Sequence, residues 1–252
     1  MLTSPAQIST TETRRIQRAF YRYQLFCNLF GAVIRKRHDN GTNDERLQRF
    51  LRNFEPWEIE EILCINEFVQ DKYKDVLDDV TWDFHPDDPE TRVRRKDLFT
   101  LLRTYGAELF DKSYIIGMSS LGLTALSAIF EAQGQVALIE LVSQHVAALD
   151  GDWLFEATKH HKRRGRLFTD SDEAPDSQEP MPFRGDGEHL PPLAWVFARK
   201  DTYSNLYGAY SIRSLREWGY VMWDASRLTS SGGADILNIE WEDFCTESED
   251  DL

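Results

Sequence analysis

Apolar residues near the N-terminus recur at alternating steps of four and three, the spacing of one face of an α-helix. They are Ile16, Phe20, Tyr23, Cys27, Phe30 and Ile34. The STTE motif just before them offers Ser9 as an N-cap and Glu12 as its reciprocal partner, which predicts a helix beginning near Thr10. A second apolar row falls on another side of this helix: Tyr21, Leu25, Leu29 and Val33. Helices with two apolar sides usually pack between neighbours, so we expect a central helix with four aromatic residues in the core: Phe20, Tyr23, Phe26 and Phe30.

Further helical patterns follow along the chain. A short helix is expected around 47–54, and a longer one starts at Pro56, where the missing N–H costs nothing in the first turn. Helices are also predicted over these segments: 98–109, 119–131, 134–148 and 210–219. No convincing alternation typical of strands occurs before residue 190. The pattern predicts an all-α fold, a single irregular multi-helix domain with a mobile insertion and a C-terminal helical cap.

Shifts in composition divide the chain into four parts. Residues 1–158 form a helical core, and 159–191 carry a basic segment followed by an acidic loop rich in Pro, Gly and Ser. Such composition is typical of a mobile loop or linker, here near 166–190. Residues 192–235 are expected to form a C-terminal cap that packs on the core. Residues 236–252 are an acidic tail expected to fray.

The segment LREWGYVMWDASRL, residues 215–228, concentrates aromatic side chains between charged ones. Leu215, Trp218 and Met222 fall at helical spacings, and Gly219 offers a helix stop. Trp and Tyr rings usually bury most of their area and keep a polar end hydrogen-bonded. We therefore interpret the segment as a structural cap over the core in preference to a ligand pocket.

A stretch without charge, residues 113–130, tests whether the chain enters a membrane. Eighteen positions are only just membrane length. Serine, threonine and glycine lower its hydrophobicity, and it has neither an aromatic belt nor a basic flank. A buried helix is the favoured interpretation and a membrane span is the alternative.

Charge and cysteine content narrow the possible partners and compartments. A net charge of −14 argues against nucleic acid or anionic lipid as a partner of the whole chain. Three cysteines match neither a disulfide framework nor a zinc site, and the N-terminus lacks the apolar region of a secretory signal. We expect a location in the cytosol, the nucleus or both. Residues 12–37 hold seven Lys and Arg against one Glu, while the last seventeen residues hold seven acids and no base, so the tail and the first helix should attract each other weakly.

No catalytic signature is evident, and we predict no cofactor, metal or catalytic residue. An enzyme assembled from dispersed residues, such as His145 with the loop Asp83–Asp88, is the alternative. The octet KHHKRRGR is the one concentrated basic feature, and it is either a nuclear-import or polyanion-binding segment or a helix end whose charges favour the dipole. Its basic side chains belong to Lys159, Lys162, Arg163, Arg164 and Arg166.

Three segments together resemble a group of uncharacterised fungal helical proteins, some of which carry an F-box ahead of the same helical region. The segments are TETRRIQRAFYRYQLFCNLFG, FLRNFEPWEIEEILCINEFVQDKY and LREWGYVMWDASRL. The resemblance implies a helical architecture and, for members with an F-box, a substrate-receptor role in a cullin-type ubiquitin ligase. Here the first helix starts too near Met1 to leave room for an F-box, so direct adaptor recruitment is not expected. The resemblance implies no catalytic residues.

These observations predict a non-enzymatic protein-interaction module, adaptor-like or substrate-receptor-like, with a protein partner whose identity the sequence does not give. A nuclear factor that uses the basic octet is a further alternative to the dispersed-site enzyme.

Overall fold

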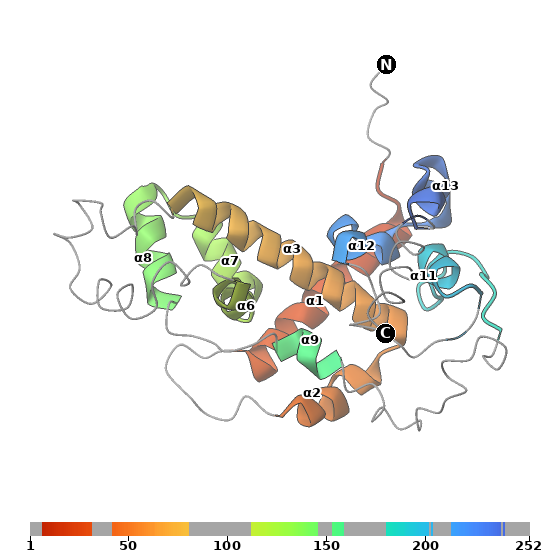
Figure 1. Cartoon of the computed structure of the whole chain (residues 1–252), viewed down its shortest axis with the longest axis horizontal. Coiled ribbons are helices and arrows are strands. Elements are labelled where there is room, and N and C mark those ends of the chain that lie inside the picture. The colour runs from red at the N-terminus through yellow and green to blue at the C-terminus, as the bar shows by residue number, and fades with distance from the viewer. Residues whose placement is uncertain are drawn as a thin grey trace, which may run out of the picture. The chain divides into compact units, whose positions relative to one another are not determined.

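The computed structural model describes residues 7–31, 42–80, 112–145, 153–158, 180–201, 203, 213–237 and 239. Helices make up most of these residues, and no β-strand occurs among them (Figure 1). The prediction of an all-α fold is confirmed. The expected helix at 98–109, residues 159–179 of the insertion, and most of the acidic tail lie outside the described residues.

Contacts within the chain group its residues into two compact units. The first comprises residues 1–22, 43–67 and 157–252, and the second comprises 23–42 and 68–156. Helices α1 (Thr10–Phe30) and α3 (Pro56–Val80) each start in the first unit and end in the second.

The first unit brings the starts of α1 and α3 together with helices from the C-terminal part of the chain. It contains α2 (Asn43–Arg49), the 3₁₀ helix η1 (Leu51–Asn53), α11 (Leu193–Ala198) and α12 (Arg213–Trp218). The 3₁₀ helix η6 (Tyr220–Met222) and α13 (Ala225–Ser230) follow, and α9 (Trp153–Thr158) ends in this unit. Burial of large apolar side chains, each contributing about 1.5–3 kcal/mol, stabilises the unit. Its core includes Leu47, Leu51, Ile59, Ile62, Trp195, Val196, Tyr220 and Val221.

The second unit combines the ends of α1 and α3 with three helices from the middle of the chain: α6 (Lys112–Ser119), α7 (Gly122–Phe130) and α8 (Gln135–His145). The buried hydroxyl of Tyr23 donates a hydrogen bond of 2.6 Å to the carbonyl of Ser119, which satisfies both groups and fixes α1 against the end of α6. The core of this unit includes Tyr23, Phe26, Phe30, Val69, Tyr73, Ile116, Met118, Leu126, Ile129 and Val142.

The uncharged stretch 113–130 is divided between two short helices. Helix α6 ends at Ser119, and α7 starts at Gly122, whose φ of +77° is a left-handed conformation that glycine adopts at little cost. Across the ranges given above, no helix is both long enough and apolar enough to cross a membrane.

Local sequence signals place the helix starts as predicted. The Ser9 hydroxyl accepts from the amide of Glu12 at 3.0 Å, and the Glu12 carboxylate accepts from the amide of Ser9 at 2.9 Å. This is a complete capping box, and α1 begins at Thr10. Helix α3 begins at Pro56 as expected, and Glu58 closes a similar cap on the amide of Glu55 at 2.9 Å.

The C-terminal segment folds as the sequence indicates. Helix α12 stops at Trp218, and Gly219 follows with a φ of +70°, which turns the chain into η6. Tyr220, Val221 and Met222 are then buried. The indole N–H of Trp223 donates to the carbonyl of Trp218 at 3.1 Å. These residues are part of the core of the first unit, and their interpretation as a structural cap stays a prediction.

The prediction that α1 is buried on two sides is wrong. Tyr23, Phe26 and Phe30 are buried and Phe20 is half-buried, but Tyr21, Leu25 and Leu29 are exposed. The spacing of apolar residues shows which ones share a face. It does not show how many neighbours the helix has, and in the described residues only one of the two apolar rows of α1 is covered.

The described end of the predicted mobile insertion makes specific contacts. The Asp186 carboxylate accepts from the amide of Ala225 at 3.0 and 3.2 Å, and Glu188 pairs with Arg14 at 3.0 Å. Pro192 is buried just before α11 starts. Asp186 and Glu188 therefore hold this part of the chain to the start of α13 and to α1.

Candidate functional site

The largest concentration of charged side chains in the described first unit lies where α1, α3 and the C-terminal helices meet. Helix α1 carries arginines at positions three or four apart, so they share a face. Arg18 donates to both carboxylate oxygens of Glu61, from Nε at 2.8 Å and from Nη2 at 2.6 Å. Arg22 donates to Glu58 at 2.9 Å. Bidentate guanidinium–carboxylate bonds of this kind are the strong ones in proteins, and they fix α1 relative to the start of α3.

A second buried pair joins α3 to α12. Arg216 donates to Glu60 from Nε and Nη2, and both side chains are buried. Burial alone lowers the pKa of Arg216, but the adjacent charge and hydrogen bonds of Glu60 outweigh it and raise that pKa above its ordinary value. Burial raises the pKa of Glu61, and the bonds from Arg18 oppose that rise only in part.

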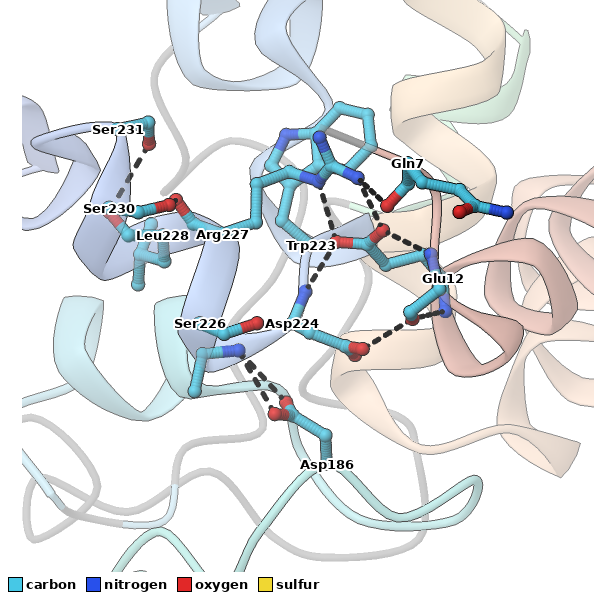
Figure 2. Close-up of polar contacts among 12 residues, drawn as sticks. Gln7, Glu12, Asp186, Trp223, Asp224, Ser226, Arg227, Leu228, Ser230 and Ser231 are labelled. Atoms are coloured by element: carbon cyan, nitrogen blue, oxygen red, sulfur yellow. Dashed lines mark hydrogen bonds and ion pairs between the residues drawn. The ribbon is translucent and has the colours of Figure 1, made fainter. Parts of the chain in front are cut away.

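The carboxylate of Glu12 is the centre of a third cluster, which Figure 2 shows in detail. It accepts four hydrogen bonds. The donors are the amide of Ser9, the amide of Asp224 at 3.1 Å, and Nε and Nη2 of Arg227 at 2.7 and 2.8 Å. Despite the cost of burial, these donors hold the pKa of Glu12 at about 2, the bond from Arg227 being the largest influence.

Asp224 completes this cluster from the other side. Its carboxylate accepts from the hydroxyl of Ser9 and from Nη1 of Arg15, the latter at 3.0 Å. Arg15 is buried, and its Nη2 lies 3.6 Å from Asp186. We call Ser9, Glu12, Arg15, Asp224 and Arg227 the cap cluster, because it joins the N-terminal cap of α1 to the start of α13.

The chemistry open to these groups is limited by their pairing. A general base or nucleophile needs a free lone pair and access to substrate. The carboxylates of Glu60 and Glu61 are fully buried, and each is bonded to a guanidinium. These pairs therefore hold helices together and present no reacting atom.

The described cysteines are also inert. Burial raises the pKa of Cys27 to about 12 and that of Cys64 well above its ordinary value. A protonated, buried thiol is a poor nucleophile and a poor metal ligand. Among the residues described, no group of three or more His, Cys, Asp or Glu side chains is placed to hold a metal ion.

Most of the candidate site residues predicted from the sequence do not belong to these three clusters. The basic octet, with its five Lys and Arg residues, and the loop Asp83–Asp88 lie outside the described residues. His145 is the last residue of α8, and the structure places its backbone only. The dispersed site that would combine His145 with this loop therefore lies outside the described residues.

Sequence reasoning identified Ser9 and Glu12 as a cap but missed the rest of the cluster. Glu12 lies 215 residues from Arg227, and Arg15 lies 209 residues from Asp224. Pairs this distant leave no periodic signal in one sequence. The excess of basic residues in α1 does correspond to ion pairs. The acids that the α1 arginines bind among the described residues lie in α3, in the 186–188 loop and at Asp224. The acidic tail lies almost entirely outside the described residues.

One further feature of this region is a contact between a cation and an aromatic ring. The guanidinium of Arg227 lies over the ring of Trp223, 5.2 Å from its centroid. Trp223 and Arg227 are both half-buried.

Comparison of the chain with known protein families, with characterised proteins and with solved structures finds no significant match. The geometry of the described residues is therefore the basis on which a function is proposed.

Proposed function

We propose that this chain is a non-enzymatic protein-interaction module, and that the exposed apolar row on α1 is its contact surface. The side chains of Tyr21, Leu25 and Leu29 are 72%, 36% and 56% exposed. They follow one another at four-residue steps along a single helix. Contiguous apolar side chains on a surface are typical of interaction sites, whereas scattered ones are ordinary.

The surroundings of the row suit a protein partner. Gln24 and Asn28 lie beside it and are joined by a hydrogen bond of 2.7 Å. These side chains are polar and uncharged. Arg18 and Arg22, which stand three residues before Tyr21 and Leu25 on the same helix, are already paired with Glu61 and Glu58 of α3. An apolar centre with a polar rim is the usual anatomy of a protein–protein interface. We infer a partner that contributes apolar side chains, as an amphipathic helix does.

The ion pairs support this role by holding α1 in place. Arg18 and Arg22 bind Glu61 and Glu58 of α3, so the first half of α1 cannot rotate about its axis without breaking buried bonds. A rigid helix loses little conformational freedom when a partner binds, and preorganisation of this kind raises affinity. This arrangement supports a fixed recognition surface.

The resemblance to fungal helical proteins supports a more specific version of the same proposal, in which the chain acts as an adaptor or substrate receptor in the cytosol or nucleus. In that version the partner on α1 is either a target protein or a component of a ubiquitin ligase. The two are distinguished by whether a cullin and its adaptor accompany the partner.

The test is affinity purification of the full chain from its native cell, with quantitative mass spectrometry. Leu29→Glu places a charge in the row, and Val136→Glu places the same charge on an equally exposed apolar residue of α8. Circular dichroism first establishes that both variants are folded. We expect a specific set of proteins to be lost with Leu29→Glu and retained with Val136→Glu. Equal recovery with both variants would show that this row is not the contact surface.

A second measurement separates a partner protein from self-association. Light scattering of the purified chain gives its molar mass across a range of concentrations. The proposal is supported if the chain is a monomer and the proteins that it captures are lost in Leu29→Glu. A dimer that dissociates in Leu29→Glu would instead assign the row to contact between two copies.

A further inference from the structure

Asp224 occupies the N-cap position of α13, yet its carboxylate does not cap that helix. Aspartate at an N-cap normally accepts from amides in the first turn of its own helix. Here the carboxylate accepts from Ser9 and Arg15 of the α1 region, and Asp186 accepts from the amide of Ala225 in its place. The carboxylate of Asp224 is therefore bonded to the α1 region and not to the first turn of α13.

Glu12 shows the reciprocal arrangement. As the third residue of α1, the N3 position of the capping box, it accepts from the amide of Ser9 and closes the start of α1. The same carboxylate accepts from the amide of Asp224 and from two nitrogens of Arg227 in α13. The carboxylate that closes the start of α1 is therefore also bonded to α13, and the carboxylate at the N-cap of α13 is bonded to the α1 region and not to its own helix.

This sharing makes the two ends interdependent. If α13 moves away, Asp224 withdraws from Ser9 and Glu12 loses three of its four donors, so the buried carboxylate of Glu12 keeps only the amide of Ser9. If the first turn of α1 unwinds, Arg227 loses the Glu12 carboxylate that neutralises its charge, and the amide of Asp224 loses the same carboxylate as its acceptor. A buried charged group without its partner is costly, so states in which only one end is open are disfavoured.

We propose that the first turn of α1 and the whole of α13 form one latch, which opens and closes as a single cooperative unit. Native proteins open locally in such units, whose free energies lie below that of global unfolding. Opening of the latch uncovers Leu228 and the half-buried Trp223. The latch lies in the first unit and does not involve Leu25 or Leu29, so it stands independently of the proposed contact surface.

Hydrogen–deuterium exchange of the full chain tests the proposal through amides whose acceptors are known. The amide of Thr13 bonds to the carbonyl of Ser9, the amide of Leu228 to that of Asp224, and the amide of Ser231 to that of Arg227. Ser9→Ala removes both the cap of α1 and the bond to Asp224. We expect exchange to accelerate about tenfold in peptides covering both α1's first turn and α13, and by the same factor in each.

Thr13→Ala is the matched control, because the hydroxyl of Thr13 bonds only to the carbonyl of Ser9 and makes no contact with α13 among the contacts described. It should leave exchange in α13 within about threefold of the parent chain. Arg227→Lys is the reciprocal variant, since it keeps the charge but loses the bidentate bond, and it should accelerate exchange at Thr13. Faster exchange at one end only, in either Ser9→Ala or Arg227→Lys, would overturn the proposal. If Ser9→Ala does not fold, Arg227→Lys alone decides the question by the same comparison.

Discussion

Arg216 donates two hydrogen bonds to Glu60, from Nε at 2.6 Å and from Nη2 at 3.2 Å, across 156 residues of sequence. The two side chains are 3% and 0% exposed. A charge buried to this degree is stabilised by its partner, and removal of one member leaves the other without compensation. This pair therefore holds α12 against α3, and loss of either side chain should strongly destabilise the fold.

Arg216→Met should lower the free energy of unfolding by about 3–5 kcal/mol, because Glu60 remains buried and unpaired. The double variant Glu60→Met with Arg216→Met should recover most of that loss, since no charge is then buried. Arg213→Met is the control on the same helix: its side chain is 51% exposed, and its pairs should contribute less than about 1 kcal/mol. Chemical denaturation of the parent chain and these three variants measures the losses. A loss below about 1 kcal/mol for Arg216→Met would mean that water reaches Glu60.

Stability at low pH should depend on Glu12. Its pKa is held at about 2, below the ordinary 4.5, so this carboxylate contributes stability that is fully present above about pH 4.5 and is lost as pH falls towards 2. The shift corresponds to about 3 kcal/mol. Glu12→Gln should be less stable at pH 7, and the difference from the parent chain should shrink steadily between pH 4.5 and 2.

Urea denaturation at a series of pH values tests this. Glu217→Gln alters an exposed glutamate and is the control, with an expected loss of less than about 1 kcal/mol at pH 7. If the difference between the parent chain and Glu12→Gln does not change below pH 4.5, the four donors around Glu12 do not hold its charge in the folded state.

Local signals in the sequence predict much of the fold. The capping box at Ser9, the proline at position 56 and the glycine at 219 each act within a few residues, and each marks the helix boundary that the structure shows. Periodicity likewise places Tyr23, Phe26 and Phe30 on a buried face. These features depend on neighbours along the chain, so one sequence contains the information.

The cap cluster and the buried pairs depend on neighbours in space. Arg18 and Glu61 are 43 residues apart, and Ser9 and Asp224 are 215 residues apart. Charged residues usually face solvent, so Glu60, which stands next to Glu61 and close to Glu58 in the sequence, gives no sign that Arg216 will cover it. The exposure of Tyr21 could not be predicted for the same reason: periodicity shows which residues share a face of α1, but not which faces other helices cover.

Burial along α1 predicts a graded response to alanine. Phe26 is fully buried and Phe20 is half-buried. Phe26→Ala should therefore cost about 3–5 kcal/mol, and Phe20→Ala should cost clearly less. Tyr21→Ala should change stability by no more than about 0.5 kcal/mol, since its side chain is exposed. Thermal or chemical denaturation gives the order, and an equal loss at positions 20 and 21 would contradict it.

Gly31 directly follows α1, and its backbone lies against the start of the turn that separates α6 from α7. A Cβ atom at this position would stand 2.1 Å from the carbonyl oxygen of Ser120 and 2.4 Å from that of Cys27. Both contacts are with backbone, so no side chain can rotate away to relieve them. The carbonyl of the neighbouring residue Ser119 is meanwhile held by the buried hydroxyl of Tyr23.

Gly31→Ala should therefore lower the free energy of unfolding by about 1–3 kcal/mol, as overpacking of a tight site does. Asn28→Ala, at an exposed position near the end of the same helix, should be nearly neutral and serves as the control. The amide of Ser120, bonded to the carbonyls of Ile116 and Gly117, should also exchange faster in Gly31→Ala, because the end of α6 has to move to admit the methyl group. Unchanged stability together with unchanged exchange would show that the end of α1 does not approach Ser120 this closely, and the packing of the second unit would then need a different explanation.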